Sequence, residues 1–307
     1  MDILDQLMKF AQISGSINVQ CKLQDAWYIR HERQSCHGIV HIVSQGQGYL
    51  HIDGVERVIK LKTNDVVFLP HSLGHSLTHQ PNYEGSSKIK TISNGAFTLK
   101  QCGGESPDLS LFCANFTYDK QSELFNNLPE VILLNLQDAS LKPLLEILQR
   151  EADGYQAGSE NIINALLSVL LTLLIRTYLQ QDNAQLNGLL NGLRDKRLYN
   201  VISNIIAKPE QNWKIETLCH IANLSRAQLI RLFNQQIGVS PYNFVNHIRL
   251  QKAAELLKHS QQSVLSIALN CGFQSESNFG KAFKNIINSH QDNIGKVNKF
   301  TKVCRKN

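Results

Sequence analysis

The sequence predicts an α+β protein with a β-barrel in its N-terminal part and an all-α domain in its C-terminal third. From about residue 17 to 118, short runs rich in β-branched residues alternate with turns marked by Gly, Asn and Pro, as in an all-β barrel or sandwich. After about residue 136, apolar residues instead recur every three or four positions, which is the period of an amphipathic helix. A length of 307 residues favours two domains.

The composition is that of a globular chain, with 42% hydrophobic and 18% charged residues. The longest apolar run, residues 165–175, is too short to span a bilayer and is expected to form a buried helix. The first ten residues, MDILDQLMKF, lack a basic region followed by an apolar core, which predicts no signal peptide and a cytoplasmic protein. The seven cysteines form no CxxC pair, which argues against a zinc site and a disulfide framework.

Charge is spread unevenly along the chain. Residues 195–307 contain sixteen Lys and Arg against six Asp and Glu, whereas residues 1–194 carry a net charge of −4. A basic C-terminal third on an acidic remainder suggests that this third meets a polyanion. A solvated basic face is the alternative, and charge alone does not decide between them.

In the N-terminal part, strands are predicted at 39–43, 48–53, 56–61 and 65–70. Helices are predicted at 140–152 and 160–181, and the apolar stripe of the second is broad enough to require packing on the barrel or on a partner subunit. We therefore expect four regions. They are a barrel with a helical dimerisation segment over 1–182, a linker over 183–194, a helical domain over 195–284 and a separate tail over 285–307.

The helical domain contains an approximate internal repeat. In the first copy, residues 215–222 form a helix, a turn follows, and Ser225 is placed to cap a second helix, whose inner face contains Leu229 and Phe233. In the second copy, residues 264–283 repeat this order, with a turn at Gly272 and a cap at Ser275. A connecting helix is predicted over 243–258. Two helix-turn-helix units on a basic background favour binding to successive major grooves of DNA over a plain helical bundle.

The repeat also carries a family resemblance over about residues 200–284. Ala268, Gly272-Phe273, Ser275, Phe279 and Phe283 stand as in the C-terminal hallmark of the AraC/XylS transcription regulators. Residues 1–130 resemble the cupin-type sensor barrel of a subgroup of that family, in the segments 46–54, 65–75 and 125–134. The resemblance implies a DNA-binding regulator rather than an enzyme, and specifically an inducer-responsive activator of efflux or stress-response genes. It also implies a cytoplasmic homodimer that meets a double-stranded operator and RNA polymerase but no membrane.

The family pattern gives the DNA-binding residues of the first unit as Ser225, Arg226, Ala227, Gln228, Ile230 and Arg231. Of these, Ala227, Ile230 and Arg231 would face the groove. Arg231 is able to bind guanine through two hydrogen bonds, whereas the two apolar side chains only touch methyl groups. Arg226 and Gln228 are better suited to phosphate contacts, which position the protein without specifying sequence.

The corresponding residues of the second unit are Glu276, Ser277, Gly280 and Lys281. Gly280 has no side chain and Glu276 is anionic, so this helix is expected to be the poorer base reader. Lys281 is expected to contact phosphate. Specificity is therefore predicted to lie mainly in the first unit.

An apolar cavity for a small hydrophobic inducer is the default expectation for a sensor barrel. The candidate lining residues are Trp27, Ile39, Ile42, Tyr49, Phe68 and Phe112. Each is equally compatible with ordinary barrel core. The candidate metal ligands are five histidines, His41, His51, His71, His75 and His79. No His-x-His followed by Glu occurs, so we predict neither a metal nor another cofactor, and a cupin-type metalloenzyme is a weak alternative.

Oxidant sensing by thiols is a further alternative. Cys21 and Cys113 stand where a hypochlorite-sensing subgroup of the resembling regulators also has cysteines. A sensor thiol needs exposure and a low pKa, and Lys22 offers a positive charge next to Cys21. Buried, inert cysteines are the competing interpretation and the favoured one.

The last 23 residues depart from the family pattern. Relatives continue past the second unit with Pro, two residues, an aromatic and Arg, and this chain does not. Reading the last base of each codon from Asn285 with the first two of the next permits HYQFSPGQYR followed by a stop, which contains the missing element. We therefore interpret residues 285–307 as a frameshifted basic tail and expect the second recognition helix to end at Lys284.

Overall fold

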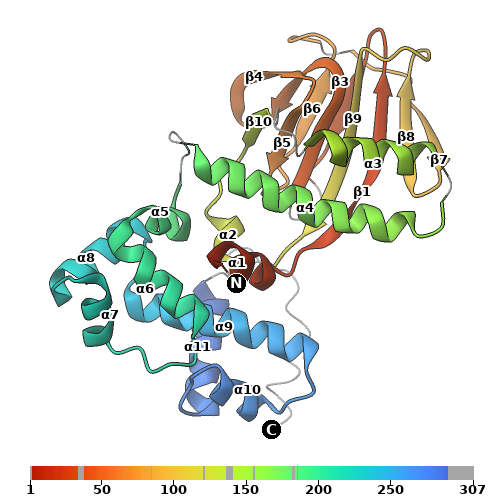
Figure 1. Ribbon diagram of the computed structural model, residues 1–307. Helices are drawn as coiled ribbons and strands as arrows, with labels where there is room; N and C mark the ends of the chain where they lie inside the picture. The colour runs from red at the N-terminus through yellow and green to blue at the C-terminus, as the bar shows by residue number, and fades with distance from the viewer. Residues whose placement is uncertain are drawn as a thin grey trace. The chain divides into compact units, whose positions relative to one another are not determined.

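The chain forms two compact units, which are described separately (Figure 1). One unit is Leu7–Leu190, and the other is Asn191–Asn307 together with the first six residues. The computed structural model describes residues 2–289 except 34–37, 84, 120–121, 136–140, 155, 182–183 and 185. The division at residue 190 falls inside the predicted linker 183–194. That segment is not wholly irregular, however, because helix α5 occupies Gly188–Arg194.

The N-terminal unit is a curled, mainly antiparallel sheet, as the alternating pattern predicts. Its strands are β1 (Ser14–Leu23), β2 (Tyr28–His31), β3 (Gly38–Ile52), β4 (Val55–Lys62), β5 (Asp65–Leu69), β6 (His75–Thr78), β7 (Lys90–Asn94), β8 (Phe97–Cys102), β9 (Leu109–Thr117) and β10 (Ile132–Asn135). The main order is β10-β5-β3-β9-β1-β8-β7, while β4 and β6 pair with β3, and β2 pairs with β6. The short helix α2 (Glu123–Asn126) belongs to the same unit, whereas α1 (Ile3–Ala11) is divided between the two units after Gln6.

Strand β3 belongs to both halves of this sheet. Its first part pairs with β5 and β9, and its last part pairs with β4 and β6. The pairing with β9 shifts register between Val43 and Gln45, and Gly46 follows with φ of +85°. A bulge of this kind bends a strand and lets it pass from one sheet to another. The predicted strands 39–43 and 48–53 are therefore one continuous strand rather than two.

Alternation along the strands places apolar side chains on the concave side of the sheet. The cluster there includes Trp27 and Leu50, which are fully buried, together with Val67, Leu77 and Leu111. Because successive strand residues point to opposite faces, the neighbours of these residues point to the other side. The concave interior and the convex face are thus two separate packing environments.

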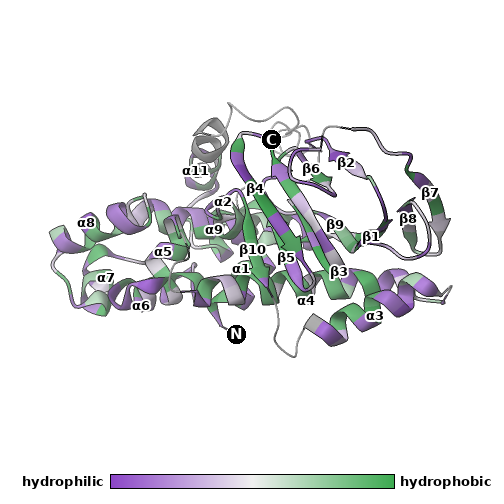
Figure 2. Cartoon of the chain, turned by 90° about the horizontal axis from the view of Figure 1, so that it is seen from above, coloured by the Kyte–Doolittle hydropathy of each residue, from purple (hydrophilic) through white to green (hydrophobic). Residues whose placement is uncertain are grey.

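The convex face is covered by helices α3 (Leu141–Asp153) and α4 (Ser159–Gln180), which lie across the sheet in Figure 1. In Figure 2 α3 is banded in green and purple, as expected for a helix with one face on a sheet. Helix α4 packs on β1 and β10 through Ile163, Leu167, Leu170 and Leu174, which are buried. By length and composition, the whole of α4 is long and apolar enough to cross a membrane, although the eleven-residue apolar run within it is too short to do so. The packing of α4 is nevertheless that of a helix covering a sheet.

The C-terminal unit is all-helical, as predicted. After α5 come α6 (Lys196–Ala207), α7 (Ile215–Ala222), α8 (Arg226–Gln236), α9 (Pro241–His259), α10 (Val264–Asn270) and α11 (Glu276–Ser289). Helix α9 contacts α6 on one side and both α10 and α11 on the other, so it joins the two helix-turn-helix units. The connecting helix is slightly longer than the predicted 243–258.

Both predicted caps are present. The Ser225 hydroxyl accepts a hydrogen bond from the backbone N–H of Gln228, and the Ser275 hydroxyl accepts one from Asn278. A capping side chain satisfies a backbone donor that the first turn leaves free. Asn223, with φ of +51°, makes the turn before α8. Both second helices therefore start where the sequence predicts.

The predicted end of α11 at Lys284 is wrong, because the helix continues to Ser289. The segment 285-NIINS-289 contains no Gly or Pro to stop it. Residues 290–307 of the predicted frameshifted tail lie outside the described residues, so the frameshift stays a prediction about the gene. A frameshift and a helical start to the tail are compatible, since helix propensity depends only on the residues present.

Gly272 is expected to be the least replaceable glycine of the C-terminal unit. Its φ is +88°, and an added Cβ would lie 2.7 Å from the backbone oxygen of Glu210. Gly238 has nearly the same φ, +87°, but its added Cβ would meet nothing within 4 Å. Gly238→Ala should therefore cost only the left-handed strain of about 1–2 kcal/mol, whereas Gly272→Ala should cost more. Calorimetric unfolding of the full chain measures both, and equal losses would contradict the steric argument.

Candidate nucleic-acid interface and sensor interior

Helix α8 presents the predicted reading face to solvent. Leu229 and Phe233 are fully buried, and the Phe233 ring packs edge-on against Phe244 of α9 with centroids 5.8 Å apart. The residues of the opposite face that sequence analysis singled out are Ser225, Arg226, Ala227, Gln228 and Arg231, all exposed, and Ile230, which is half-buried. The buried pair fixes the rotation of the helix, so these side chains share one outward surface.

Gln228 has a structural task that the sequence prediction did not include. Its side-chain oxygen accepts hydrogen bonds from the backbone N–H and the hydroxyl of Ser225, at 3.0 and 2.9 Å. With the return bond from Ser225, this forms a capping box, which satisfies two backbone donors at once. The carboxamide oxygen of Gln228 is thus committed to the helix start, and only its NH₂ group remains suited to a phosphate.

Helix α11 offers a weaker version of the same surface. Glu276, Ser277 and Lys281 are exposed, and Gly280 is half-buried in a place where an added Cβ would meet nothing within 4 Å. The inner face is held by Phe279, whose ring stands 5.3 Å from that of Phe273. The one cationic side chain among the four predicted contact residues is Lys281, and Glu276 at the first turn opposes a phosphate backbone.

Arg249, on α9, joins the two helix-turn-helix units of the C-terminal unit. Its guanidinium donates to the backbone oxygens of Pro209 and Gln211, at 2.8 and 2.9 Å, in the loop before α7. The same group lies over the Phe273 ring at 5.8 Å, a distance at which cation–π attraction operates. Burial lowers the pKa of Arg249 from its usual value. This basic side chain is therefore part of the scaffold rather than of the exposed basic surface.

The six predicted inducer-contact residues do not share one surface. Trp27 and Ile39 belong to the concave cluster. Ile42 pairs directly with Phe112 across β3 and β9, and Phe68 packs against the rings of Phe116 and Phe125, so these three point to the convex side. Tyr49 is half-buried and adjoins Leu50, which is in the concave cluster. The group is divided because side chains alternate between the two faces of a strand. Ile39 and Ile42 are three positions apart and therefore face opposite ways.

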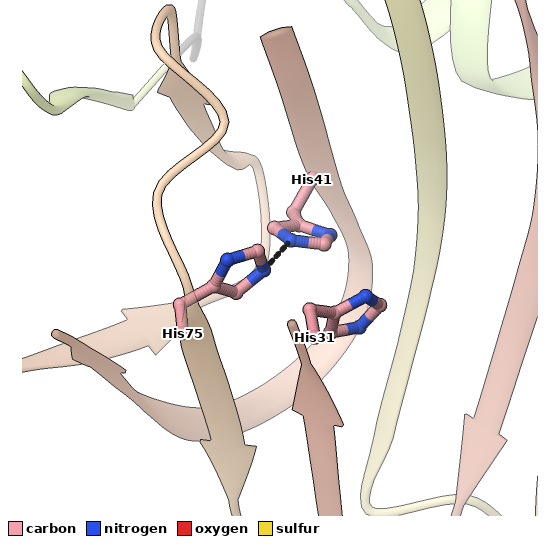
Figure 3. A group of neighbouring side chains, drawn as sticks. All are labelled: His31, His41 and His75. Carbon is pink, nitrogen blue, oxygen red and sulfur yellow. Dashed lines mark hydrogen bonds between the residues drawn. The ribbon is translucent and has the colours of Figure 1, made fainter. Parts of the chain in front are cut away.

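Three histidines meet inside the concave face, and sequence analysis identified two of them. Figure 3 shows His31, His41 and His75 converging from β2, β3 and β6. His31 and His75 are direct cross-strand partners, and their rings stack with centroids 4.7 Å apart. The Nε2 atoms of His41 and His75 lie 2.7 Å apart. All three side chains are buried.

The other candidate histidines serve elsewhere. His51 bonds to the Thr78 hydroxyl, His71 to the backbone oxygen of Leu128, and His79 to the backbone of Trp27. His31 was missed because it fits no His-x-His pattern. The available signal was the alternation of 28-YIRH-31, which places His31 on the same face as buried Ile29.

Burial keeps these three imidazoles neutral. It lowers the pKa of His31 to about 3, and it lowers the pKa of His41 and His75 from the usual value, with mutual repulsion adding to the effect for His31 and His41. The backbone oxygen of Leu73 lies 2.8 Å from His75 Nδ1 and only accepts, so that nitrogen carries a hydrogen. His41 Nε2 then donates to His75 Nε2, and His41 Nδ1 accepts from the Cys113 thiol at 3.1 Å.

The two predicted redox cysteines lie side by side but are both buried, at 0% and 3% exposure for Cys21 and Cys113. The side-chain hydrogen bond with Cys21, together with burial, raises the pKa of the Cys113 thiol well above its usual range. Lys22 does not reach them, because it points to the convex side and pairs with Asp153 at 4.0 Å. This environment is the reverse of the exposed, low-pKa thiol that oxidant sensing requires.

Comparison with known families divides the chain in the same way. A family model described as "Cupin" matches residues 2–180, and one described as "Helix-turn-helix domain" matches residues 218–289. The first covers the curled sheet with α3 and α4. The second contains α8, α9, α10 and α11.

Curated relatives match nearly the whole chain. The HTH-type transcriptional regulator MtrA of Neisseria gonorrhoeae is 50% identical over 92% of this chain and 94% of its own length. An HTH-type transcriptional regulator of Haemophilus influenzae is 42% identical over 93% of this chain and 95% of its own. The RCS-specific HTH-type transcriptional activator RclR of Escherichia coli is 27% identical, over 92% and 93% respectively.

Thiol reactivity is expected to follow burial among the five described cysteines. Cys219 is half-buried, whereas Cys21, Cys102, Cys113 and Cys271 are buried. In the folded chain, iodoacetamide should modify Cys219 at least ~10-fold faster than Cys113, since the reactive species is an accessible thiolate. Timed alkylation followed by peptide mass spectrometry measures this. Equal rates at the two sites would show that the interior opens readily and would revive thiol sensing.

Proposed function

The chain belongs to the AraC family of helix-turn-helix transcriptional regulators, and on that premise we propose that it is an inducer-responsive activator that reads its operator mainly with α8. The observation that carries this proposal is the outward face of α8, where Arg226 and Arg231 are exposed on a helix fixed by buried Leu229 and Phe233. A helix with this exposure is able to enter the major groove of double-stranded DNA.

The division of labour between the two units rests on side-chain chemistry. Arg231 has the planar donor pair that recognises the guanine edge, and Ala227 and Ile230 supply apolar contacts for thymine methyl groups. In α11, Glu276 and Gly280 supply neither. Lys281 fits a phosphate contact, which adds affinity without sequence information. We therefore assign base reading to the first unit and positioning to the second.

The high identity to MtrA supports two further parts of the proposal. Regulation of efflux or stress-response genes is the target class that fits a regulator 50% identical to MtrA over nearly its whole length. Activation at such promoters would bring the chain into contact with RNA polymerase in the cytoplasm. A catalytic role has no place in this proposal, since the matched relatives carry the names of transcriptional regulators.

We propose that two copies associate through α4. Beside its buried face, this helix exposes Ile162 at 40% and Val169 at 49%, and it leaves Leu166 and Leu173 half-buried. These four residues recur at spacings of three and four and so form one stripe. A continuous apolar stripe on a soluble protein indicates an interaction surface, and a second copy of α4 is self-complementary to it.

Arg231→Ala should weaken binding to the operator by about 1–3 kcal/mol and relax the preference at one base pair. Lys281→Ala is the matched control, because losing a phosphate contact should weaken all sequences alike and lower the salt slope by about 1. Fluorescence anisotropy titrations with operator and scrambled duplexes at several salt concentrations separate the two effects. Unchanged operator affinity in Arg231→Ala would remove α8 from the reading role.

Val169→Glu should convert the dimer into a monomer, because it places a charge at the centre of the α4 stripe, where it would be buried without a partner. Ser168→Glu, at an exposed position on another face near the centre of the same helix, adds the same charge off the stripe and should leave the dimer intact. Sedimentation velocity at micromolar concentration distinguishes the two states. A wild-type chain that sediments as a monomer would contradict the assignment of α4.

A further inference from the structure

We propose that His31, His41 and His75 form a binding site for one divalent transition-metal ion of the zinc type inside the curled sheet. Each residue offers one ring nitrogen, and these nitrogens all lie within 4.8 Å of one another. Imidazole is a ligand that zinc, copper, iron and nickel accept. Three protein nitrogens with a fourth position left open is a common zinc arrangement. This site is separate from the DNA-binding helices.

The distances require only small movements of the rings. Nitrogens that bind Zn²⁺ at 2.0–2.1 Å in a tetrahedron are about 3.3 Å apart. The His41 and His75 Nε2 atoms, now 2.7 Å apart and joined by a hydrogen bond (Figure 3), would separate by about half an ångström around an ion. His31 would turn its ring out of the stack with His75. Both changes are rotations about side-chain bonds and leave the strand pairing intact.

An orphaned nitrogen is the independent sign of a missing partner. Among the described residues, His31 Nε2 is buried with no hydrogen-bond partner. A buried polar atom without a partner costs on the order of 1–3 kcal/mol, and such atoms in folded proteins commonly mark an ion or a water. The His31 ring stands 4.7 Å from the His75 ring and 5.2 Å from the His41 ring, measured between centroids. An ion held by all three would satisfy this atom.

The other ring nitrogens of His41 and His75 already have orienting partners. His75 donates from Nδ1 to the Leu73 backbone oxygen at 2.8 Å, which leaves its Nε2 lone pair facing the cluster. His41 Nδ1 faces the Cys113 sulfur at 3.1 Å. When His41 Nε2 binds an ion, the ring hydrogen moves to Nδ1 and donates to that sulfur. Metal-binding histidines typically have a hydrogen-bond partner of this kind, which fixes the tautomer and the ring orientation.

Two cationic side chains, Lys100 and Arg30, act on the cluster. Both lower the pKa of His31, and Lys100 also lowers that of His41, so each opposes a bound cation. Arg30 donates to both Asp53 carboxylate oxygens at 2.7 Å and to Glu32 at 3.0 Å, so its charge is offset twice. All three imidazoles are buried, which disfavours their charged form, and only an unprotonated nitrogen binds a metal. The described residues within the ligand group include no carboxylate, so the fourth position is left to solvent or to an exogenous donor.

The test uses the full chain, stripped with a chelator and titrated with Zn²⁺ in competition with a chromophoric chelator. We expect one tight site per chain in the wild type. His31→Ala should weaken it at least ~10-fold, because one of three ligands is lost, and His75→Ala should do the same. His51→Ala is the matched control, since His51 lies on β3 with His41 but bonds to Thr78 outside the cluster. Its affinity should equal that of the wild type.

Co²⁺ substitution keeps the test decisive if a variant fails to fold. The wild-type chain should give the intense visible absorption of a four-coordinate cobalt site, and one equivalent of Zn²⁺ should abolish it. The proposal is overturned if the wild type binds no zinc tightly, or if folded His31→Ala and His75→Ala variants keep wild-type affinity. A weak six-coordinate cobalt spectrum would overturn it as well.

Discussion

The N-terminal unit depends on β3 bending from one half of the sheet into the other. The bend at Val43–Gly46 lets the first half of this strand pair with β5 and β9 while its second half pairs with β4 and β6. Without it the strands would form a flat sheet with no enclosed side. The same bend sets His41 in the first half opposite the β2–β6 pair that carries His31 and His75. The histidine cluster is therefore a product of the curl and not of any local motif.

In the C-terminal unit α9 plays the corresponding part. It buries Phe244 against the first helix-turn-helix unit and Leu250 and Ala253 in the cluster of the second. Arg249 between them anchors the loop before α7 and covers Phe273. Because one helix supplies contacts to both units, the spacing of α8 and α11 is fixed by packing rather than by a flexible connection. That spacing is what a protein needs to meet two successive grooves.

The sequence predicted local features well and spatial coincidences poorly. Caps at Ser225 and Ser275 follow from short-range chemistry, and both are present. Helix α11 ends five residues later than predicted, because no residue in 285–289 forces a stop. Helix α5 lies within the predicted linker. Both cases show that the bounds of elements are harder to predict than their presence. The mistaken grouping of Ile39 with Ile42 shows a different limit. Both are apolar and buried, yet the alternation of side chains along the strand places them on opposite faces. Their separation of three positions already showed this in the sequence.

No pattern along the chain predicts that the three histidines form a cluster. His31 and His75 are 44 positions apart and meet only because β2 and β6 pair. Likewise, Cys113 meets His41 because β9 lies beside β3. Residue type and alternation predict that each side chain lies in the interior of the sheet, but strand pairing decides which of these side chains are neighbours. Long-range pairing is the information that a single sequence lacks.

Strand β1 connects this interior to the helix that we propose joins two copies. Cys21 on its concave side adjoins Cys113 and so the histidines. On its convex side, Gln20 bonds to Gln149 of α3, and α4 packs along the strand. A single strand thus separates the interior from both covering helices. Close-packed interiors transmit small displacements instead of absorbing them, and β1 contacts both the cysteine pair inside the sheet and the two helices outside it. For the association through α4 that we propose, β1 is thus the strand that adjoins both the interface helix and the interior.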